Sequence, residues 1–495
     1  MSTTDLPASG VGTDEAIRPE YHHQLTNEDL APLKKRTWSW YNVFAFWMSD
    51  VHSVGGYVTA GSLFALGLAS WQVFISLIVG IVIVQVLANL VAKPSQVTGV
   101  PYPVISRVAF GVRGANIPAV IRGLIAVAWY GIQTYLASAA LMIVIVKLFP
   151  ATAAWTVVAD HGFLGLSAMG WLAYGILWVA QAVVFWNGMD SIRRFVDFAG
   201  PAVYVVMLAL AIYLVANAGW ENIDLNLAAV SYSGWQALGM MIVAISLVVS
   251  YFSGPLLNFG DISRYGTSYQ QVKKGNFWGL PVNFTFFSVL TVVCAAATVP
   301  VYGRLITDPV ETIAEIDNTF AVVLGALTVT IATIGINIVA NFISPAFDFS
   351  HVSPQRISWR TGGMIAAVGS VLLTPWNLYS SPDVIHYTLD VLASFTGPLF
   401  GILVCDYYLI RHQQVDVDDL FTMSPTGRYW YRNGVNPKAV AATVIGGLIA
   451  LAPVLMPGDF FGTVANFSWF IGAGVGAGAY YLLASRNAPA TVPVP

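Results

Sequence analysis

Long runs of apolar residues dominate this sequence, and they constrain its fold more than any other feature. A helix needs about 20 consecutive apolar residues to cross the hydrocarbon core of a membrane. Twelve stretches of about that length follow one another along the chain, at approximately residues 40–66, 70–92, 119–146, 165–187, 197–217, 235–258, 277–301, 319–346, 361–376, 385–410, 438–456 and 460–484. We therefore predict an all-α integral membrane protein with twelve transmembrane helices.

The composition supports a membrane protein and excludes several other classes. Hydrophobic side chains make up 57% of the residues and charged ones only 9%, whereas a soluble domain carries about 25% charged residues. So few polar side chains cannot cover a water-exposed body of this size, which excludes a soluble enzyme and a disordered chain. The net charge is −3 without a strongly basic cluster, so nucleic acid is not an expected partner.

The placement of Lys and Arg predicts the orientation of the spans, because cytoplasmic loops collect positive charge. With the N-terminus inside, all but two of the 22 Lys and Arg residues fall in cytoplasmic segments. The exceptions are Lys147 and Arg304. We expect both termini in the cytoplasm and a location in the cell membrane, which would be the inner membrane in a bacterium.

No linker or low-complexity segment divides the chain, so we predict a single transmembrane domain at 37–485 between cytoplasmic tails at 1–36 and 486–495. The N-terminal tail is polar and lacks the apolar core and small-residue cleavage site of a secretory signal. The first span is therefore expected to act as its own uncleaved insertion signal.

Two spans carry a polar, glycine-containing interruption near their middle. In the first span it covers residues 49–56, and in the sixth it covers 251–255, which includes Pro255. Proline removes a backbone donor and glycine weakens a helix, so each site can unwind, with a simple kink as the alternative. Paired broken helices five spans apart indicate an inverted repeat with a binding site at the breaks. We predict a 5+5 inverted repeat, spans 1–5 and 6–10, followed by two appended helices.

Several short motifs, taken together and in order, suggest a family. They are Gly-Val-Arg-Gly-Ala at 111–115, Trp-Tyr-Gly-Ile-Gln-Thr at 129–134, Asn-Phe-Gly-Asp-Ile-Ser-Arg-Tyr at 258–265, Asn-Ile-Val-Ala-Asn-Phe-Ile-Ser-Pro-Ala at 337–346, and Gly-Pro at 397–398 followed by Cys-Asp-Tyr-Tyr-Leu-Ile-Arg at 405–411. From about Trp38 to the twelfth span the chain resembles the nucleobase:cation symporter-1 family, whose members take up cytosine, uracil, purines, allantoin or hydantoins. The resemblance implies the same inverted-repeat fold.

The resemblance also implies a substrate site formed by Trp129, Gln133, Phe252 and Asn341, with Ser53 at a position in the first-span break that is often glutamine. Two aromatic rings can sandwich a flat heterocycle. Gln133 and Asn341 each offer a carbonyl and an amide NH₂, which match the alternating edge of a uracil or ureide. Plain core packing of the rings and hydrogen bonding between helices are the structural alternatives.

Some family members hold sodium with two hydroxyl side chains of the eighth span. The resemblance places Gly335 and Ile336 at those positions, and neither offers a side-chain oxygen. Asp50 and His52 are titratable groups in the first span, and ionisable residues inside a span are functional candidates. We expect proton coupling through Asp50 and His52 rather than sodium coupling, with structural hydrogen bonding as their alternative role.

The function predicted from the sequence is secondary active import of a nucleobase or related cyclic ureide by alternating access. Uracil-type pyrimidines rank first, followed by allantoin or hydantoins. An amino-acid symporter of the same fold is the alternative, although it would need a cationic or helix-N-terminal partner for the substrate carboxylate and fits the aromatic pair Trp129 and Phe252 less well. An enzyme is not expected, because no nucleophile, metal cluster or acid–base pair stands at a usable spacing. We predict no cofactor, no metal and no obligate protein partner. The roles of Asp390, Asp261 and Arg264 stay open.

Overall fold

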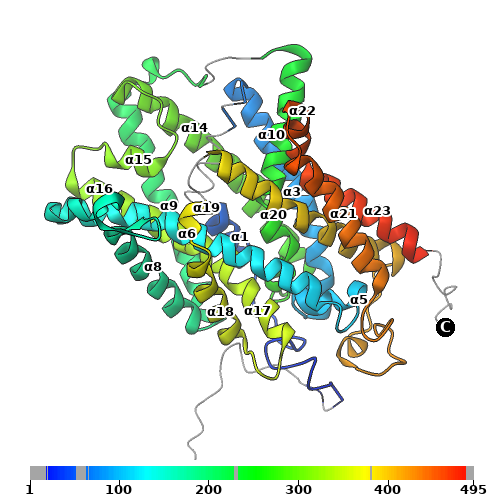
Figure 1. Cartoon of the computed structure of the whole chain (residues 1–495). Helices are drawn as coiled ribbons and strands as arrows, with labels where there is room; N and C mark the ends of the chain where they lie inside the picture. Colours follow the sequence, from blue (N-terminus) through cyan, green and yellow to red (C-terminus); the bar gives the residue numbers. More distant parts are fainter. Residues whose placement is uncertain are drawn as a thin grey trace, which may run out of the picture.

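The computed structural model describes residues 18, 20–51, 63–64, 66–227, 232–378 and 382–485, apart from a few side chains near residue 385 (Figure 1). Helices in the first half of the chain are α1 (Trp40–Val51), α3 (Ser70–Thr98), α4 (Tyr102–Ile105), α5 (Arg107–Phe110), α6 (Asn116–Leu148), η1 (Pro150–Thr156), α7 (Val158–His161), α8 (Ala168–Trp186), α9 (Met189–Ala218) and η2 (Trp220–Asn222). The strands β1 (Gly162–Phe163) and β2 (Leu166–Ser167) form one antiparallel hairpin, in which Gly162 pairs with Ser167.

The second half is also helical. Its helices are α10 (Gly234–Tyr251), α11 (Ser253–Leu257), α12 (Gly260–Ser263), α13 (Tyr269–Phe277), α14 (Asn283–Tyr302), α15 (Pro309–Ala314), α16 (Thr319–Ile336), α17 (Ile343–Val352), α18 (Trp359–Leu372), α19 (Pro375–Leu378), α20 (Pro382–Val404), η6 (Asp418–Phe421), α21 (Pro437–Leu455), α22 (Asp459–Ala465) and α23 (Ser468–Ser485). Three π-helical segments, η3 (Trp278–Val282), η4 (Asn337–Phe342) and η5 (Cys405–Ile410), continue into or out of the long helices of the seventh, eighth and tenth spans.

The number of spans is the main point at which the structure differs from the sequence prediction. Within the described residues, nine helices are long and apolar enough to cross a membrane, or ten if α22 and α23, which meet at an angle of 66°, form one span. The predicted first span is described as a helix only to Val51. The ninth, α18, has 14 residues and ends before Pro375, whose ring disfavours helical backbone in the preceding residue. The membrane-spanning, all-helical class is confirmed, whereas the exact number of twelve stays a prediction.

The broken sixth span lies where the sequence predicts it. α10 ends at Tyr251, Phe252 stands between two helices, and α11 begins at Ser253. In the first span, α1 ends at Val51 inside the predicted interruption, and the rest of that interruption lies outside the described residues. The chain therefore has one described break, at which helix termini and side chains can face a cavity.

The long helices of the two halves make equivalent contacts with each other. α3 of the second span packs against α10 of the sixth, and α13 of the seventh packs against α1 of the first. α6 of the third span lies along α16 and α17 of the eighth. Exchanging spans 1–5 with spans 6–10 would produce these same pairings. The arrangement supports the inverted repeat, which remains a prediction in its details.

The last helices form a closely packed group in which α23 lies against both α20 and α21 (Figure 1). Glycines allow this approach. A Cβ atom on Gly401 of α20 would lie 2.1 Å from the carbonyl oxygen of Ala473, and one on Gly476 of α23 would lie 2.8 Å from Cα of Pro398. Small residues at four-residue spacing are typical of such close helix pairs in membranes.

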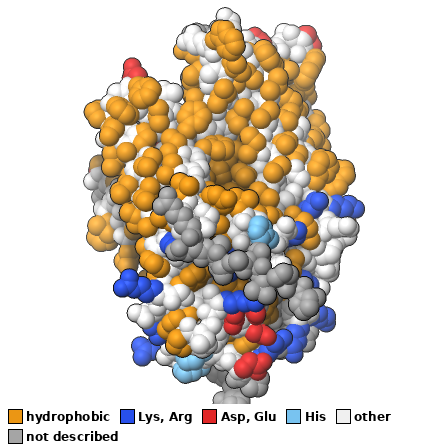
Figure 2. Space-filling model, turned by 90° about the vertical axis from the view of Figure 1, so that its right-hand side faces the viewer, with side chains coloured by type: hydrophobic (Ala, Val, Ile, Leu, Met, Phe, Trp, Pro, Cys, Tyr) orange, Lys and Arg blue, Asp and Glu red, His pale blue; other side chains and the backbone are white. Residues whose placement is uncertain are grey.

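Three arginines that the sequence analysis assigned to cytoplasmic segments are completely buried: Arg107, Arg122 and Arg264. Arg264 donates to the carbonyl oxygens of Asp29, Ala31 and Gly99. These bonds fasten the N-terminal segment to the end of the bundle. On the face that Figure 2 shows, Lys and Arg side chains gather in the lower half, below a mainly hydrophobic surface.

Candidate functional site

A cavity of about 360 Å³ lies where the break of the sixth span faces the third and eighth spans. It is lined by Asp50, Trp129, Gln133, Tyr251, Gly254, Pro255, Ile336, Ala340 and Asn341. Four separate segments of the chain, α1, α6, the α10–α11 break and the α16–η4 helix, therefore contribute to one site. Aromatic and polar side chains line the cavity beside small ones, a combination that suits a flat molecule with polar edges.

Four of the residues expected from the sequence meet at this cavity. Trp129 and Gln133 lie one turn apart on α6 and therefore project from the same face. Asn341 comes from the π-helical segment η4, and Asp50 from the end of α1. π-Helical segments are frequent at functional sites, because the extra residue changes the direction of the side chains.

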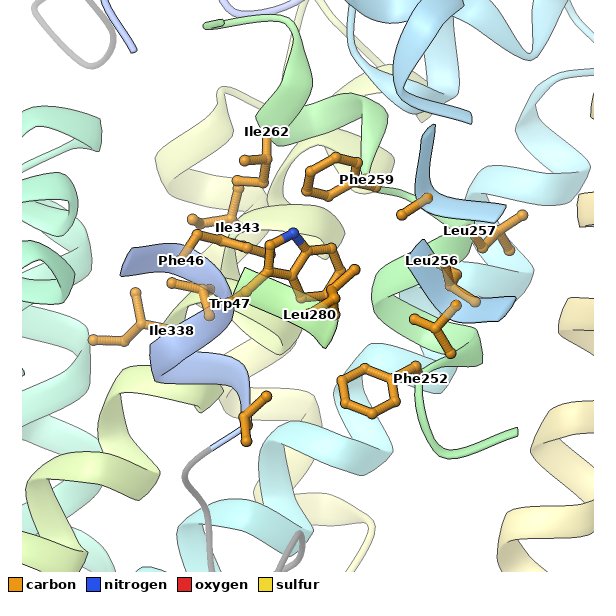
Figure 3. Close-up of a cluster of buried hydrophobic side chains, with 14 of the residues drawn as sticks. Phe46, Trp47, Phe252, Leu256, Leu257, Phe259, Ile262, Leu280, Ile338 and Ile343 are labelled. Carbon is orange, nitrogen blue, oxygen red and sulfur yellow. The ribbon is translucent and has the colours of Figure 1, made fainter. Parts of the chain in front are cut away.

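Phe252 does not line the cavity, contrary to the position that the family resemblance implies for it. Its side chain is fully buried in the cluster around Trp47, at 6.3 Å between ring centroids, and it also contacts Phe284 at 5.6 Å (Figure 3). The neighbouring Tyr251 faces the cavity instead, edge-on to Trp129 at a centroid distance of 6.3 Å. Successive residues of a helix point about 100° apart, so a one-residue difference exchanges the core and cavity positions.

The Asn341 side chain is held by a polar network that the sequence analysis did not predict. Asn341 Nδ2 donates to Asn337 Oδ1 at 3.2 Å, and Asn337 Nδ2 lies 2.9 Å from Thr134 Oγ1 and 2.6 Å from Gln181 Oε1. All four side chains are buried. The four-residue spacing of Asn337 and Asn341 could have indicated that these two side chains meet on one helix face. Gln181 could not be predicted, because it comes from a span that contains none of the family motifs.

Two acceptor atoms at the cavity lack a hydrogen-bond partner within the described part of the chain: Gln133 Oε1 and Asp50 Oδ1. Both side chains are almost completely buried, at 1% exposure each. Leaving a buried acceptor unpaired costs about 1–3 kcal/mol, and more if the group is charged. The cavity is therefore suited to a ligand that brings N–H donors to these two atoms.

The remaining predicted residues fall into two groups. His52 and Ser53 lie outside the described residues. Gly335 and Ile336, the positions of the implied sodium ligands, are on α16, where Ile336 lines the cavity and a Cβ on Gly335 would lie 3.5 Å from Cβ of Ser49. Neither residue brings a side-chain oxygen to the junction of the first and eighth spans.

The geometry identifies a class of protein. A polar cavity at a broken helix, enclosed by several long apolar helices, is the arrangement by which secondary transporters bind substrates. Membrane-spanning helices interrupted at such a cavity are tolerated because the freed backbone faces protein or water rather than lipid. The chain is thus built as a multi-pass membrane transporter.

The chain belongs to the family of permeases for cytosine/purines, uracil, thiamine and allantoin, whose family model matches residues 31–472. It is 32% identical over 475 residues to the allantoin permease of Bacillus subtilis, covering 95% of this chain and 96% of that protein. It is 30% identical over 447 residues to the purine-uracil permease NCS1 of Arabidopsis thaliana, covering 89% and 73% of the two chains. These relatives are permeases, so the chain is a transporter and not an enzyme.

Among solved structures, the fold is similar to that of Mhp1, a nucleobase-cation-symport-1 family transporter, in a closed conformation with bromovinylhydantoin bound. The TM-score is 0.74 at 22% identity, and the match covers 93% of this chain and 95% of the other. The inward-facing conformation of Mhp1 gives a TM-score of 0.69 at 21% identity, covering 95% and 96% of the chains. The family and the predicted fold class are confirmed.

Proposed function

We propose that this protein imports a cyclic ureide or nucleobase by alternating access, with allantoin as the first candidate and uracil as the second, in symport with protons and with both termini cytoplasmic. The observation that carries the proposal is the pair of unpartnered acceptors, Gln133 Oε1 and Asp50 Oδ1, in a cavity with an aromatic wall. Both candidates contain a ring that carries N–H groups, which can donate to these acceptors.

Uracil ranks before allantoin on the sequence alone, and two observations reverse that order. Allantoin carries more N–H donors than uracil, on a ring and on a flexible ureido arm, and the unpartnered atoms at this cavity are acceptors. The relative from Bacillus subtilis, matched over 95% of this chain, is an allantoin permease. A site whose buried polar groups require partners discriminates strongly against ligands that leave them unpaired.

The same geometry argues against an amino-acid substrate. The carboxyl group of Asp50 lines the cavity, where it would repel a substrate carboxylate unless it were protonated. Within the described cavity lining, there is no Lys, Arg or His side chain to pair with such an anion. A neutral heterocycle meets neither obstacle.

Proton coupling is proposed because the implied sodium positions lack side-chain oxygens and a carboxyl group lines the cavity. Neither Gly335 nor Ile336 offers a side-chain oxygen to a hard cation, which prefers oxygen ligands. Asp50 is an ionisable group buried inside a membrane protein, which makes it a candidate for binding the coupling proton.

The proposal is tested by uptake of labelled allantoin into cells that express the protein, with unlabelled allantoin, uracil, cytosine or a hydantoin added in excess. We expect accumulation of allantoin, with strong competition by allantoin and weaker competition by uracil. Asn341→Ala should abolish uptake, whereas the matched control Asn217→Ala, at an exposed position on α9, should not. Accumulation of labelled uracil but not allantoin would restore the order expected from the sequence.

A further inference from the structure

A buried charged cluster lies directly behind the wall of the candidate substrate cavity. Its members come from the third, sixth and eighth spans and from the loop after the second span, and each has at most 3% of its surface exposed: Tyr102, Arg122, Asn258, Asp261 and Asp348. Charged groups inside a membrane protein are costly and are therefore candidates for function.

Arg122 joins this cluster to the cavity. Its Nη2 donates to the carbonyl oxygen of Ala340 at 3.0 Å, and its Nε donates to Asn258 Oδ1 at 3.0 Å. A Cβ on Gly254 would lie 3.6 Å from Nη2. Ala340 and Gly254 both line the cavity, so the guanidinium group supports its wall from behind. Arg122 also lies two helical turns before Trp129 on α6, on the same face as the substrate residues.

The two carboxyl groups of the cluster differ in their hydrogen bonding. Asp261 accepts from the backbone N–H of Tyr102 at 2.7 Å and lies 3.5 Å from Asn258 Nδ2. Hydrogen bonds to a carboxylate stabilise its charged form. Neither oxygen of Asp348 has a hydrogen-bond partner among the residues that the structure describes. Asp348 is thus the carboxyl whose anion is stabilised less.

Counting charges shows that the cluster needs a proton. Arg122 interacts electrostatically with Asp50, Asp261 and Asp348, and Arg264 interacts with Asp261. Asp29 faces both Arg264 and Arg360, and it accepts from the backbone N–H of Trp359 at 2.8 Å. Three cations therefore face four carboxyl groups in the protein interior. An uncompensated buried carboxylate is strongly unfavourable, so one of the four carries a proton. Asp261 and Asp29 both accept hydrogen bonds and face Arg264, so that proton belongs to Asp50 or Asp348.

Asp348 lies on α17, and the elements packed against α17 carry the charged or titratable side chains that face Asp348. Arg122 on α6, Tyr102 on α4 and Asp261 on α12 face it. On α18, Arg360 lies over the Trp186 ring at 5.6 Å. On α17 itself, His351 accepts a hydrogen bond from Arg107 at 2.9 Å. The three groups facing Asp348 are therefore those of the cluster.

A second cavity, of about 480 Å³, adjoins the cluster from the other side. Tyr102 belongs to the cluster and also lines this cavity, together with Ser95 and Gly260. The hydroxyl groups of Tyr102 and Ser95 have no hydrogen-bond partner in the described part of the chain. Under the predicted orientation this cavity is on the cytoplasmic side, so the cluster lies between the substrate cavity and the cytoplasmic end.

We propose that Asp50 and Asp348 share one exchangeable proton across Arg122, and that Asp348 releases it toward the cytoplasm. Water carries the proton between the two carboxyl groups: it takes the proton as the O–H bond of Asp50 breaks and gives it to a carboxylate oxygen of Asp348. Arg122 then compensates the Asp50 carboxylate. Loss of the proton from Asp348 to water in the second cavity leaves an anion that attracts Arg122. The guanidinium then leaves Ala340 and Asn258, which opens the cavity wall. This inference rests on the proposed proton symport.

The test uses purified protein in proteoliposomes with the membrane potential held at zero and the interior one pH unit more alkaline. One proton per substrate allows the wild type to accumulate labelled allantoin up to about tenfold. Asp348→Asn should reduce that ratio to about one while exchange of labelled for unlabelled allantoin continues. The variant leaves three carboxylates facing three cations, so the cluster remains balanced and the protein should fold. Asp390→Asn, an intramembrane carboxyl outside the cluster, is the matched control and should accumulate normally.

The outcomes separate this inference from the function on which it rests. A wild type that exchanges allantoin but never accumulates it under the pH gradient would overturn proton symport and the inference together. Accumulation that persists in Asp348→Asn would overturn the inference alone. If Asp348→Asn fails to fold, Asp348→Glu, which retains the carboxyl group, should accumulate substrate with a shifted pH dependence, and an unchanged pH profile would count against the role of Asp348.

Discussion

At the scale of single residues, the site is defined by side chains whose hydrogen-bonding capacity the protein itself leaves unused. Gln133 Oε1 faces the cavity without a partner, whereas Asn341 is already positioned by Asn337. Gln133→Leu removes the free acceptor at nearly constant volume. We expect allantoin affinity to fall by about 1–3 kcal/mol, which is about fivefold to 150-fold. Equilibrium binding to the purified protein measures this, and Gln236→Leu, at an exposed position on α10, is the control that should bind normally.

Tyr251 and Phe252 provide a second comparison between adjacent residues. Phe252 is packed against Trp47 and Phe284, so Phe252→Ala should lower the free energy of unfolding by about 3–5 kcal/mol. Tyr251→Leu should instead weaken allantoin binding, because it removes the ring that faces Trp129 across the cavity. Apparent melting temperature and substrate affinity, measured on both variants, check the assignment. The opposite pattern would place Phe252 in the binding site after all.

At the scale of elements, close helix contacts depend on particular glycines rather than on glycine content. A Cβ on Gly476 would meet Cα of Pro398 at 2.8 Å, whereas one on Gly478, on the same helix, would meet nothing within 4 Å. Gly476→Ala should separate α23 from α20 and destabilise the protein by about 1–3 kcal/mol. Gly478→Ala should be neutral or stabilising, because alanine favours the helix. Melting in detergent distinguishes them, and equal melting temperatures would contradict this packing account.

At the scale of the whole molecule, the orientation in the membrane can be tested directly. The native cysteines, Cys294 and Cys405, are buried, so single introduced cysteines should report on accessibility. Ala153→Cys, in the exposed segment after α6, should react with a membrane-impermeant maleimide on intact cells. Thr426→Cys, in the exposed loop after η6, should react only after permeabilisation. The reverse labelling pattern would invert the predicted topology.

The class, the family and most of the helices can be predicted from the sequence, because the apolarity of a span is a local property that decides whether it enters a membrane. The break at Phe252 and the pair Trp129 and Gln133 were also predictable, since proline, glycine and one-turn spacing act within a single helix. The short length of α18 was not predicted, because hydropathy does not indicate that this helix ends before Pro375.

Which side chains come together at the cavity and in the buried cluster depends on the tertiary structure. Tyr251 rather than Phe252 lines the cavity, because Phe252 packs against Trp47 and Phe284, which come from other spans. Arg122 was assigned to a cytoplasmic segment by its charge, yet it is buried, since Asn258 and the Ala340 carbonyl from two other spans satisfy its donors. The energy of a buried polar group depends on its partners, and those partners lie more than a hundred residues away along the chain.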